Sequence, residues 1–195
     1  MARPQEFDQQ QVLDQAMQLF WRKGYANTSI KDLTEVTELQ PGSLYAAYKN
    51  KRNLFVLSLD FYFDNLFEAV RSILESTSPP LNRIRQFFDF LISQKIEDKQ
   101  VKSCLLVNTL LEIPLDDGDI NPRVVAMFQR FEQLFENALR EAQETGDLAD
   151  NIQPQAMAKM LMSGVIGIQV YNRMQPGEAG LRQIVDNLLA TLSAH

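Results

Sequence analysis

The sequence predicts an all-α protein of about nine helices, with an N-terminal three-helix unit followed by a larger helical bundle. Apolar residues recur three and four positions apart in segment after segment of the 195-residue chain, as on one face of a helix. Alternation of apolar and polar residues, the pattern of a half-buried strand, does not continue beyond about four residues. A composition of 45% hydrophobic and 23% charged residues is ordinary for a globular protein, which excludes disordered and low-complexity architectures.

The first two helices are predicted from their caps. Asp8 is a suitable N-cap for a first helix that runs up to Gly24, and this glycine supplies a left-handed stop. Thr28 or Ser29 can cap a short second helix, in which Ser29 and Asp32 have the spacing of a capping box.

Proline and asparagine mark the next two helices. Pro41 takes the favoured first position of a third helix, which ends near Tyr48. Asn50 can cap a long fourth helix from Lys51 to about Ser76. Prolines, glycines and polar loops, among them residues 97–102, separate the remaining helices, which are expected at about residues 81–96, 103–113, 121–145, 154–174 and 177–193.

Charge is distributed unevenly along the chain. The sequence has 19 Lys and Arg against 25 Asp and Glu, a net charge of −6. Up to Phe55 there are seven bases and six acids, which leaves 12 bases and 19 acids for the remainder, and residues 39–55 contain three bases and no acid. Because an acidic body repels DNA phosphates, contact with nucleic acid would be confined to this short segment. Three cations are also common on an ordinary solvated surface.

The composition argues against several other kinds of site. The sequence contains one Cys and one His, and the His is residue 195. This excludes a disulfide framework, a Cys/His zinc site and His-based catalysis. Neither a metal nor a cofactor is therefore expected. The acidic turn at residues 116–119 lacks the spacing of a calcium loop. The sequence has no phosphate-binding glycine loop and no G-x-S-x-G motif, so we do not expect an enzyme. With no secretory signal and no apolar run of about 18 residues, the protein is expected to be cytoplasmic.

Residues 8–48 have the order helix, helix, tight turn, short helix, which is the form of a helix-turn-helix unit. The last helix of such a unit enters the DNA major groove. There it needs close approach of its backbone to the DNA, a small hydroxyl group, a phenol that reaches a phosphate and a surface for thymine methyl groups. Cations beside it can hold the phosphates. The third helix offers Gly42 for the close approach, Ser43 for the hydroxyl, Tyr45 for the phenol and Ala46 for the methyl contacts. The flanking cations are Lys49 and Lys51. Three ordinary surface helices are the alternative interpretation.

Three motifs lie in this stretch. They are A-x-x-L-F-x-x-x-G-Y at residues 16–25, T-S-I-x-D-L at residues 28–33, and G-S-L-Y-x-x-Y-x-x-K at residues 42–51. With these motifs, residues 11–55 resemble the DNA-binding domain of TetR-family transcriptional repressors. The resemblance implies a homodimer that binds a palindromic operator. It also implies a DNA-binding domain over residues 1–55 and a helical effector-binding and dimerisation domain over residues 56–195.

The resemblance also implies particular DNA contacts. Thr28 and Tyr45 would touch phosphates, and Lys51 would grip the DNA backbone. The residues that would lie in or beside the groove are Gln40, Pro41, Gly42, Ser43 and Ala46. Arg3 could reach a minor groove, although a solvated terminal arginine is the simpler interpretation.

Two residues depart from the family pattern. Glu38 stands in the turn where glycine is usual, and a left-handed Glu costs about 1 kcal/mol, so a rearranged turn is the alternative. Gln40 replaces the usual Ser or Thr before the third helix and is a weaker cap.

The last two helices are expected to form a four-helix dimer interface, with burial inside the monomer as the alternative. The last helix carries an apolar stripe, and the helix before it carries small residues that allow close packing. The residues assigned to the interface are Ser163, Gly164, Gly167, Ile168, Tyr171, Ile184, Leu188 and Leu192.

Nine of the 12 phenylalanines follow residue 55, which favours a cavity for a small, apolar or aromatic effector. An aromatic stripe at helical spacing also commonly forms plain core. The candidate lining residues are Phe63, Phe67, Phe88, Phe128 and Phe131.

Cys104, the only thiol, begins the sixth helix beside Lys102. A helix N-terminus and a cation favour a thiolate that could sense oxidants or electrophiles, whereas the apolar residues 105–107 favour a buried, inert thiol. The sequence therefore predicts a repressor that is released by a small effector. The alternatives are a regulator that senses through Cys104, an effector-free DNA binder, and an α-helical enzyme.

Overall fold

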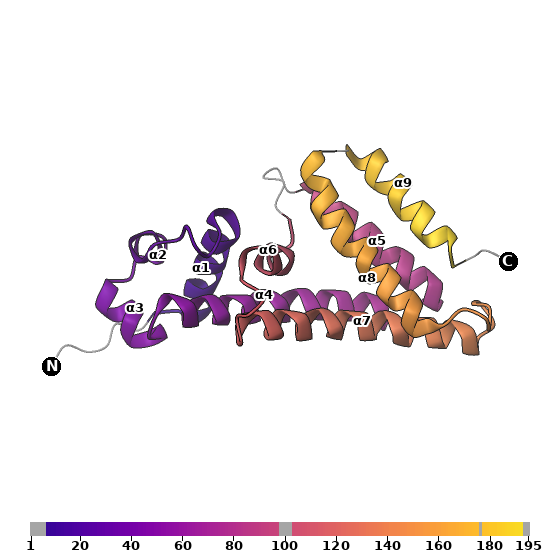
Figure 1. The fold of residues 1–195 in the computed structure, drawn as a ribbon, viewed down its shortest axis with the longest axis horizontal. Coiled ribbons are helices and arrows are strands. Elements are labelled where there is room, and N and C mark those ends of the chain that lie inside the picture. Colours follow the sequence, from indigo (N-terminus) through magenta and orange to yellow (C-terminus); the bar gives the residue numbers. More distant parts are fainter. Residues whose placement is uncertain (1–6, 98–102, 176, 193–195) are drawn as a thin grey trace.

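The computed structural model of the chain describes residues 7–97, 103–175 and 177–192 (Figure 1). Within these ranges the regular structure consists of α-helices and one short 3-10 helix, and no strand occurs, which confirms the predicted all-α fold. The elements are α1 (Gln9–Lys23), α2 (Ile30–Thr37), α3 (Pro41–Tyr48), α4 (Lys51–Leu74), α5 (Pro80–Glu97), α6 (Leu105–Glu112), α7 (Ile120–Glu144), α8 (Pro154–Tyr171), the 3-10 helix η1 (Asn172–Met174) and α9 (Gly177–Ala190).

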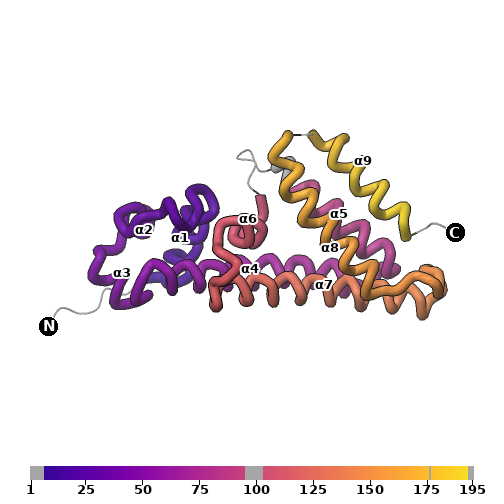
Figure 2. Tube along the Cα trace, viewed as in Figure 1, coloured from indigo at the N-terminus to yellow at the C-terminus, as the bar shows by residue number. Residues whose placement is uncertain are grey.

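The molecule is elongated, with α1, α2 and α3 clustered at one end (Figure 1). α4 leads out of this cluster along the long axis, and α7 packs against it. α5 and α8 pack on α7, and α9 packs on α5 and α8 at the outside (Figure 2). α6 lies between the N-terminal cluster and the crossing helices, where it contacts α4, α7 and α8.

Side-chain caps fix the helices of the N-terminal cluster as predicted. The Asp8 carboxylate accepts hydrogen bonds from two backbone N–H groups in the first turn of α1. Ser29 and Asp32 form the expected reciprocal capping box at the start of α2. Asn50 caps α4 by accepting a hydrogen bond from the Asn53 N–H at 2.8 Å. Each cap involves residues no more than three apart, so the local sequence specifies it.

Some helix ends differ from the prediction. Gly24 has a positive φ of 82°, but its ψ of 162° is extended, so it is not the left-handed helical stop that we expected. Glu97 is the last residue of α5 and does not begin a loop. α8 ends at Tyr171, and η1 continues the chain to Met174. Arg3, Lys102, the rest of the predicted loop and the predicted end of the last helix at residue 193 lie outside the described residues.

The N-terminal cluster shares its core with α4. The rings of Phe20 in α1 and Phe55 in α4 are both about 1% exposed and meet edge to face with centroids 4.9 Å apart. Tyr25, which follows α1, packs on the same Phe55 ring at 4.7 Å. Because these aromatic contacts join the two elements, α1 and the first turns of α4 form one packed unit.

Candidate DNA-binding surface and internal cavity

The turn between α2 and α3 contains a residue in a left-handed conformation. Glu38 has φ 56° and ψ 15°, a region that costs a residue with a side chain about 1 kcal/mol relative to glycine. The turn therefore keeps the geometry that glycine would adopt, and the rearrangement considered from the sequence does not occur. Gln40 precedes α3 without a side-chain capping bond, in line with its residue type.

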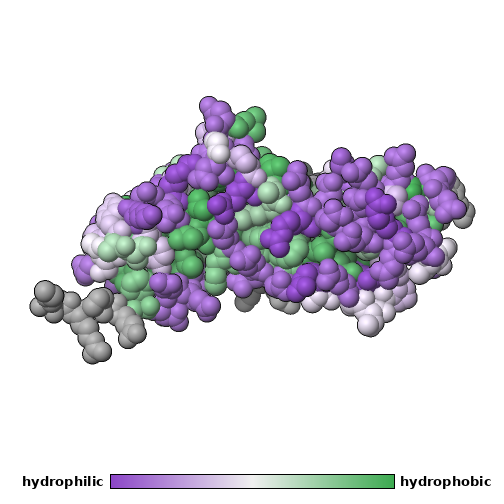
Figure 3. Space-filling model, turned by 90° about the horizontal axis from the view of Figure 1, so that it is seen from below, coloured by the Kyte–Doolittle hydropathy of each residue, from purple (hydrophilic) through white to green (hydrophobic). Residues whose placement is uncertain are grey.

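α3 buries one face and exposes the other. Leu44 and Tyr48 are buried against the rest of the cluster, and Tyr45 is 46% exposed on the opposite side. A Cβ added to Gly42 would meet no atom within 4 Å, so the backbone there lies open. The end of the molecule where α3 lies is pale or green in Figure 3 among more hydrophilic surroundings. The exposed residues of α3 are Pro41, Gly42, Tyr45, Ala46 and Ala47, and Ser43 is half-buried.

A tight turn fixes the angle between α3 and α4. Lys49 has φ 65° and ψ −54°, and the Asn50 N–H donates to the Tyr48 carbonyl at 2.7 Å, which together form a strained γ-turn. The Asn53 side chain donates to the same carbonyl at 3.1 Å. Lys49 itself is exposed beside the outer face of α3.

Thr28 and Lys51 bond within the N-terminal cluster. Thr28 is 1% exposed, and its hydroxyl donates to the Gly24 carbonyl at 2.6 Å. The Lys51 ammonium donates to the Tyr25 and Thr28 carbonyls at 2.8 and 2.9 Å and lies over the Tyr25 ring. In this conformation both side chains hold the turn between α1 and α2 in place.

α6 is bonded to the N-terminal cluster at both of its ends. At its C-terminal end the Glu112 carboxylate accepts hydrogen bonds from the backbone N–H groups of Tyr25 and Ala26, at 2.9 and 2.7 Å. Just before its N-terminal end, the Ser103 carbonyl accepts a hydrogen bond from the Trp21 indole N–H. Residues more than 80 positions apart in the chain are thereby joined, so a displacement of α6 acts on α1 and on the turn that follows it.

A third link joins α4 to the loop after α6. Arg52 donates to the Asp117 carboxylate at 2.8 Å. This hydrogen bond, with backbone N–H groups from Ile120 and Asp119, holds the pKa of Asp117 well below its usual value. The predicted turn at residues 116–119 is therefore tied to the start of α4.

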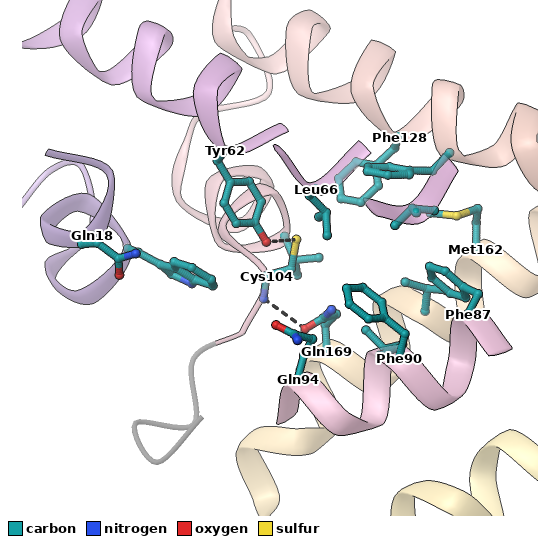
Figure 4. Close-up of a pocket in the computed structure, with 16 residues that line it drawn as sticks. Gln18, Tyr62, Leu66, Phe87, Phe90, Gln94, Cys104, Phe128, Met162 and Gln169 are labelled. Atoms are coloured by element: carbon teal, nitrogen blue, oxygen red, sulfur yellow. Dashed lines mark hydrogen bonds between the residues drawn. The ribbon is translucent and has the colours of Figure 1, made fainter. Parts of the chain in front are cut away.

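A cavity of about 200 Å³ lies between α1, α4, α5, α6, α7 and α8 (Figure 4). Two of the five phenylalanines that we assigned to a cavity, Phe128 and Phe131, line it. Phe63 and Phe88 are buried in the core instead, and Phe67 packs against Phe63 and Phe131. The full lining is Gln18, Trp21, Tyr62, Leu66, Val70, Phe87, Phe90, Leu91, Gln94, Cys104, Val107, Phe128, Phe131, Met162, Val165 and Gln169.

The sequence prediction missed the polar residues of this lining. Three glutamines and Tyr62 belong to four different helices, and no local pattern groups them. Trp21 and Gln18 were also missed, because they belong to a helix that we assigned wholly to DNA binding. From α5 we assigned Phe88 to the cavity, whereas Phe87 and Phe90 of the same helix line it.

Cys104 is the N-cap of α6, directly before the first helical residue Leu105, whereas the sequence predicted that the helix begins at about Ser103. Its side chain lines the cavity. The residue is only 6% exposed. The Tyr62 hydroxyl lies 3.5 Å from its Sγ, and the Cys104 N–H donates to Oε1 of Gln169 at 3.1 Å. Loss of contact with water raises the pKa of Tyr62, so this phenol stays protonated at neutral pH.

The residues assigned to a dimer interface fall into three groups. Ile168 and Leu192 are buried inside the monomer. Gly164 and Leu188 meet between α8 and α9, where a Cβ on Gly164 would approach Leu188 to 2.4 Å, and Ile184 is half-buried against the core. Ser163, Gly167 and Tyr171 are exposed on the outer side of α8, which also exposes Met160 and Val170, and Met174 of η1 is exposed just beyond the end of α8.

No group of three or more His, Cys, Asp or Glu side chains in the described ranges could hold a metal ion. Across the same residues, no helix is long and apolar enough to span a bilayer.

The small N-terminal cluster anchors α3 on one face and exposes its other face, as in a recognition helix. The long helix α4 joins this cluster to a bundle with a mostly apolar cavity. Together these features define the class of DNA-binding regulators. The model for "Bacterial regulatory proteins, tetR family" matches residues 12–56. The model for "Tetracyclin repressor-like, C-terminal domain" matches residues 80–188, more than half of the chain. The chain belongs to the TetR family of transcriptional regulators.

Individual relatives agree with this assignment. The chain is 25% identical to the transcriptional repressor DhaR of Mycobacterium sp. (strain GP1), over 92% of this chain and 91% of that protein. It is 27% identical to the repressor ComR of Escherichia coli (strain K12), over 96% and 90% of the two chains. A cysteine mutant of the TetR-family regulator CifR, solved with 26-base-pair operator DNA, superposes with a TM-score of 0.87 at 26% identity, over 96% of this chain and 98% of that one.

Proposed function

We propose that this TetR-family regulator is a repressor whose homodimer binds a palindromic operator and is released by a small effector. The single observation that carries the proposal is the position of the cavity. Gln18 and Trp21 of α1, the first helix of the DNA-binding unit, line it together with residues of the bundle. A molecule in the cavity therefore touches α1, which packs against α2 and α4, the two helices that contact α3.

The outer side of α3 is the proposed groove-facing surface. Gln40, Pro41, Gly42, Ser43 and Ala46 would lie in or beside the major groove, where small residues allow close approach. Tyr45 and Lys49 are exposed beside them and would contact phosphates. For Thr28 and Lys51 we propose a positioning role, because their polar atoms already hold the turn between α1 and α2.

α8 supplies the proposed dimer contact. Its outer side exposes small and apolar residues at helical spacing, from Met160 through Ser163 and Gly167 to Tyr171. The outer side of α9 is polar, and its Arg182 and Asp186 pair with α5 within the monomer. To reach two successive major grooves, the two α3 helices of the dimer would need to lie about 34–36 Å apart, which is one turn of DNA.

Effector release would act through α6 and α1. We divide the chain into a DNA-binding domain over residues 1–55 and an effector and dimerisation domain over residues 56–195, with the cavity and α6 bridging the two. A ligand that favours one position of α6 lowers operator affinity by its differential affinity for the two arrangements. Because a DNA-binding regulator acts where the chromosome lies, we propose a cytoplasmic location, and the proposal assigns the protein no enzymatic reaction.

Operator binding is tested by fluorescence anisotropy with labelled DNA from the region upstream of the chain's own gene. We expect saturable binding of two chains per site, with a log–log salt slope of about −0.9 for each phosphate neutralised. Scrambled DNA of the same length is the control. Equal affinity for both DNAs, or binding as a single chain, would contradict the proposal.

A second candidate function is the sensing of electrophiles by Cys104. The specific observation in its favour is that Sγ lines the cavity next to the Tyr62 hydroxyl. With an α,β-unsaturated carbonyl compound, the sulfur would bond to the β-carbon as the C=C π-bond breaks. The thiol proton would end on the α-carbon.

Alkylation of the folded protein decides whether this thiol reacts. We expect iodoacetamide at neutral pH to modify Cys104 within hours if the sensing function is correct, as seen by the mass of the intact protein. The same treatment in denaturant gives the fully modified reference. No mass increase in the folded protein over that time would retire the candidate.

A further inference from the structure

We infer that the effector is an uncharged molecule of about ten non-hydrogen atoms, with an apolar body and one carbonyl or hydroxyl group directed at the Cys104 end of the cavity. The inference rests on the proposed effector role of this cavity. It adds the chemical class of the ligand and its orientation, and three features of the cavity carry it.

The first feature is size. The cavity volume is about 200 Å³, whereas a protein cavity of about 150 Å³ is already large enough for benzene. A molecule with a single ring or a short chain, a few atoms larger than benzene, would fill the cavity. Larger conjugates, which carry several rings or a nucleotide, exceed this volume.

The second feature is the charge of the lining. Among its described residues there is no Asp, Glu, Lys, Arg or His. A carboxylate, phosphate or ammonium ion placed there would lose its water without gaining a partner of opposite charge, which costs several kcal/mol per ion. Glutamine amides and a phenol are neutral groups and suit a neutral partner.

The third feature is the separation of polar and apolar residues. Gln94, Gln169 and Tyr62 gather around Cys104 at one end, and Phe87, Phe128 and Met162 lie toward the other (Figure 4). Oε1 of Gln169, a buried residue, is held by the Cys104 N–H at 3.1 Å. That bond orients the amide so that its nitrogen, for which no hydrogen bond to a described residue is found, can donate to a ligand oxygen.

The chain contains its own reporter of binding. Trp21 is the only tryptophan in the sequence, and it lines the cavity. A ligand that enters should therefore change the intrinsic fluorescence without any label.

The test compares neutral and charged molecules of the same size. 4-Phenylbutan-2-one is paired with 3-phenylpropanoate, and octan-2-one with heptanoate, in Trp21 fluorescence titrations confirmed by calorimetry. We expect at least one ketone to bind at least about 100-fold more tightly than its carboxylate partner. A carboxylate that binds as tightly as its ketone, or no binding by either ketone in the millimolar range, would overturn the inference.

A conservative variant tests the orientation. Gln169→Glu keeps an oxygen for the Cys104 N–H but replaces the amide donor by a negative charge, so ketone binding should weaken by about 10-fold or more. Gln183→Glu makes the same change on the exposed side of α9 and should leave binding unchanged. Equal ketone affinity in wild type and Gln169→Glu would contradict the orientation.

Operator binding separates this inference from the proposed function. If a ketone binds the cavity but leaves operator affinity unchanged, the class of ligand stands and its role as effector fails. If the operator is bound normally and no ketone binds, the regulator stands and the ligand class is wrong.

Discussion

Replacing Ala46 by Glu is expected to weaken specific operator binding by about 100-fold or more. Ala46 is exposed on the outer side of α3, so the change should leave the folded chain intact. In the proposed complex the new carboxylate would enter the major groove of both half-sites. There the negative charge of the DNA phosphates would repel the carboxylate, which would also lose its hydrating water.

Ala126→Glu is the matched control for this variant. Ala126 is an exposed alanine inside a helix of the bundle, α7, so the substitution adds the same charge to a similar local structure away from α3. Anisotropy titrations at fixed salt, with helical content checked by circular dichroism, give the comparison. If both variants bind the operator as the wild type does, α3 is not the helix that reads DNA.

Replacing Glu112 by Ala is expected to uncouple α6 from the DNA-binding unit. The carboxylate is the acceptor for the Tyr25 and Ala26 N–H groups, and alanine offers none. Amide exchange at these two positions should accelerate by about 10-fold or more, since hydrogen bonds to a charged group are among the stronger ones. Ligand-dependent loss of operator affinity should shrink in the same variant, because one of the bonds that transmits a shift of α6 is gone.

Glu144→Ala provides the comparison for Glu112→Ala. Both residues are exposed glutamates at the last position of a helix, but Glu144 ends α7 at the opposite end of the molecule from α1–α3 (Figure 1). Hydrogen–deuterium exchange resolved to peptides that cover residues 24–27 supplies the measurement. Unchanged exchange in Glu112→Ala, or equal acceleration in both variants, would show that this carboxylate does not link the two parts.

Local sequence predicted the helices because their caps depend on near neighbours. The carboxylate of Asp8, the capping box of Ser29 and Asp32, and the amide of Asn50 each act within three residues. The left-handed Glu38 was foreseen as one of two outcomes. Which one occurs depends on whether the packing of α3 against the cluster offsets a local cost of about 1 kcal/mol, and a local pattern cannot answer that.

The cavity was predicted to exist but its lining was largely missed. Neighbouring residues on a helix point about 100° apart, so the choice between Phe87 and Phe88 depends on how α5 is rotated against α7 and α8. The apolar stripe of the last helix posed the same problem. Leu181, Val185 and Leu189 are covered within the monomer, which leaves the outer side of α8 as the proposed contact.

The sequence alone determined the all-α fold, the helix boundaries to within a few residues and, through the motifs of residues 16–51, the family. These properties follow from periodicity and capping, whose forces act over a few residues. Only the tertiary structure decided that α1 forms a wall of the cavity and that Glu112 holds the turn 87 residues away at Tyr25. Those contacts arise where helices cross, and the crossing geometry is a property of the whole packed core.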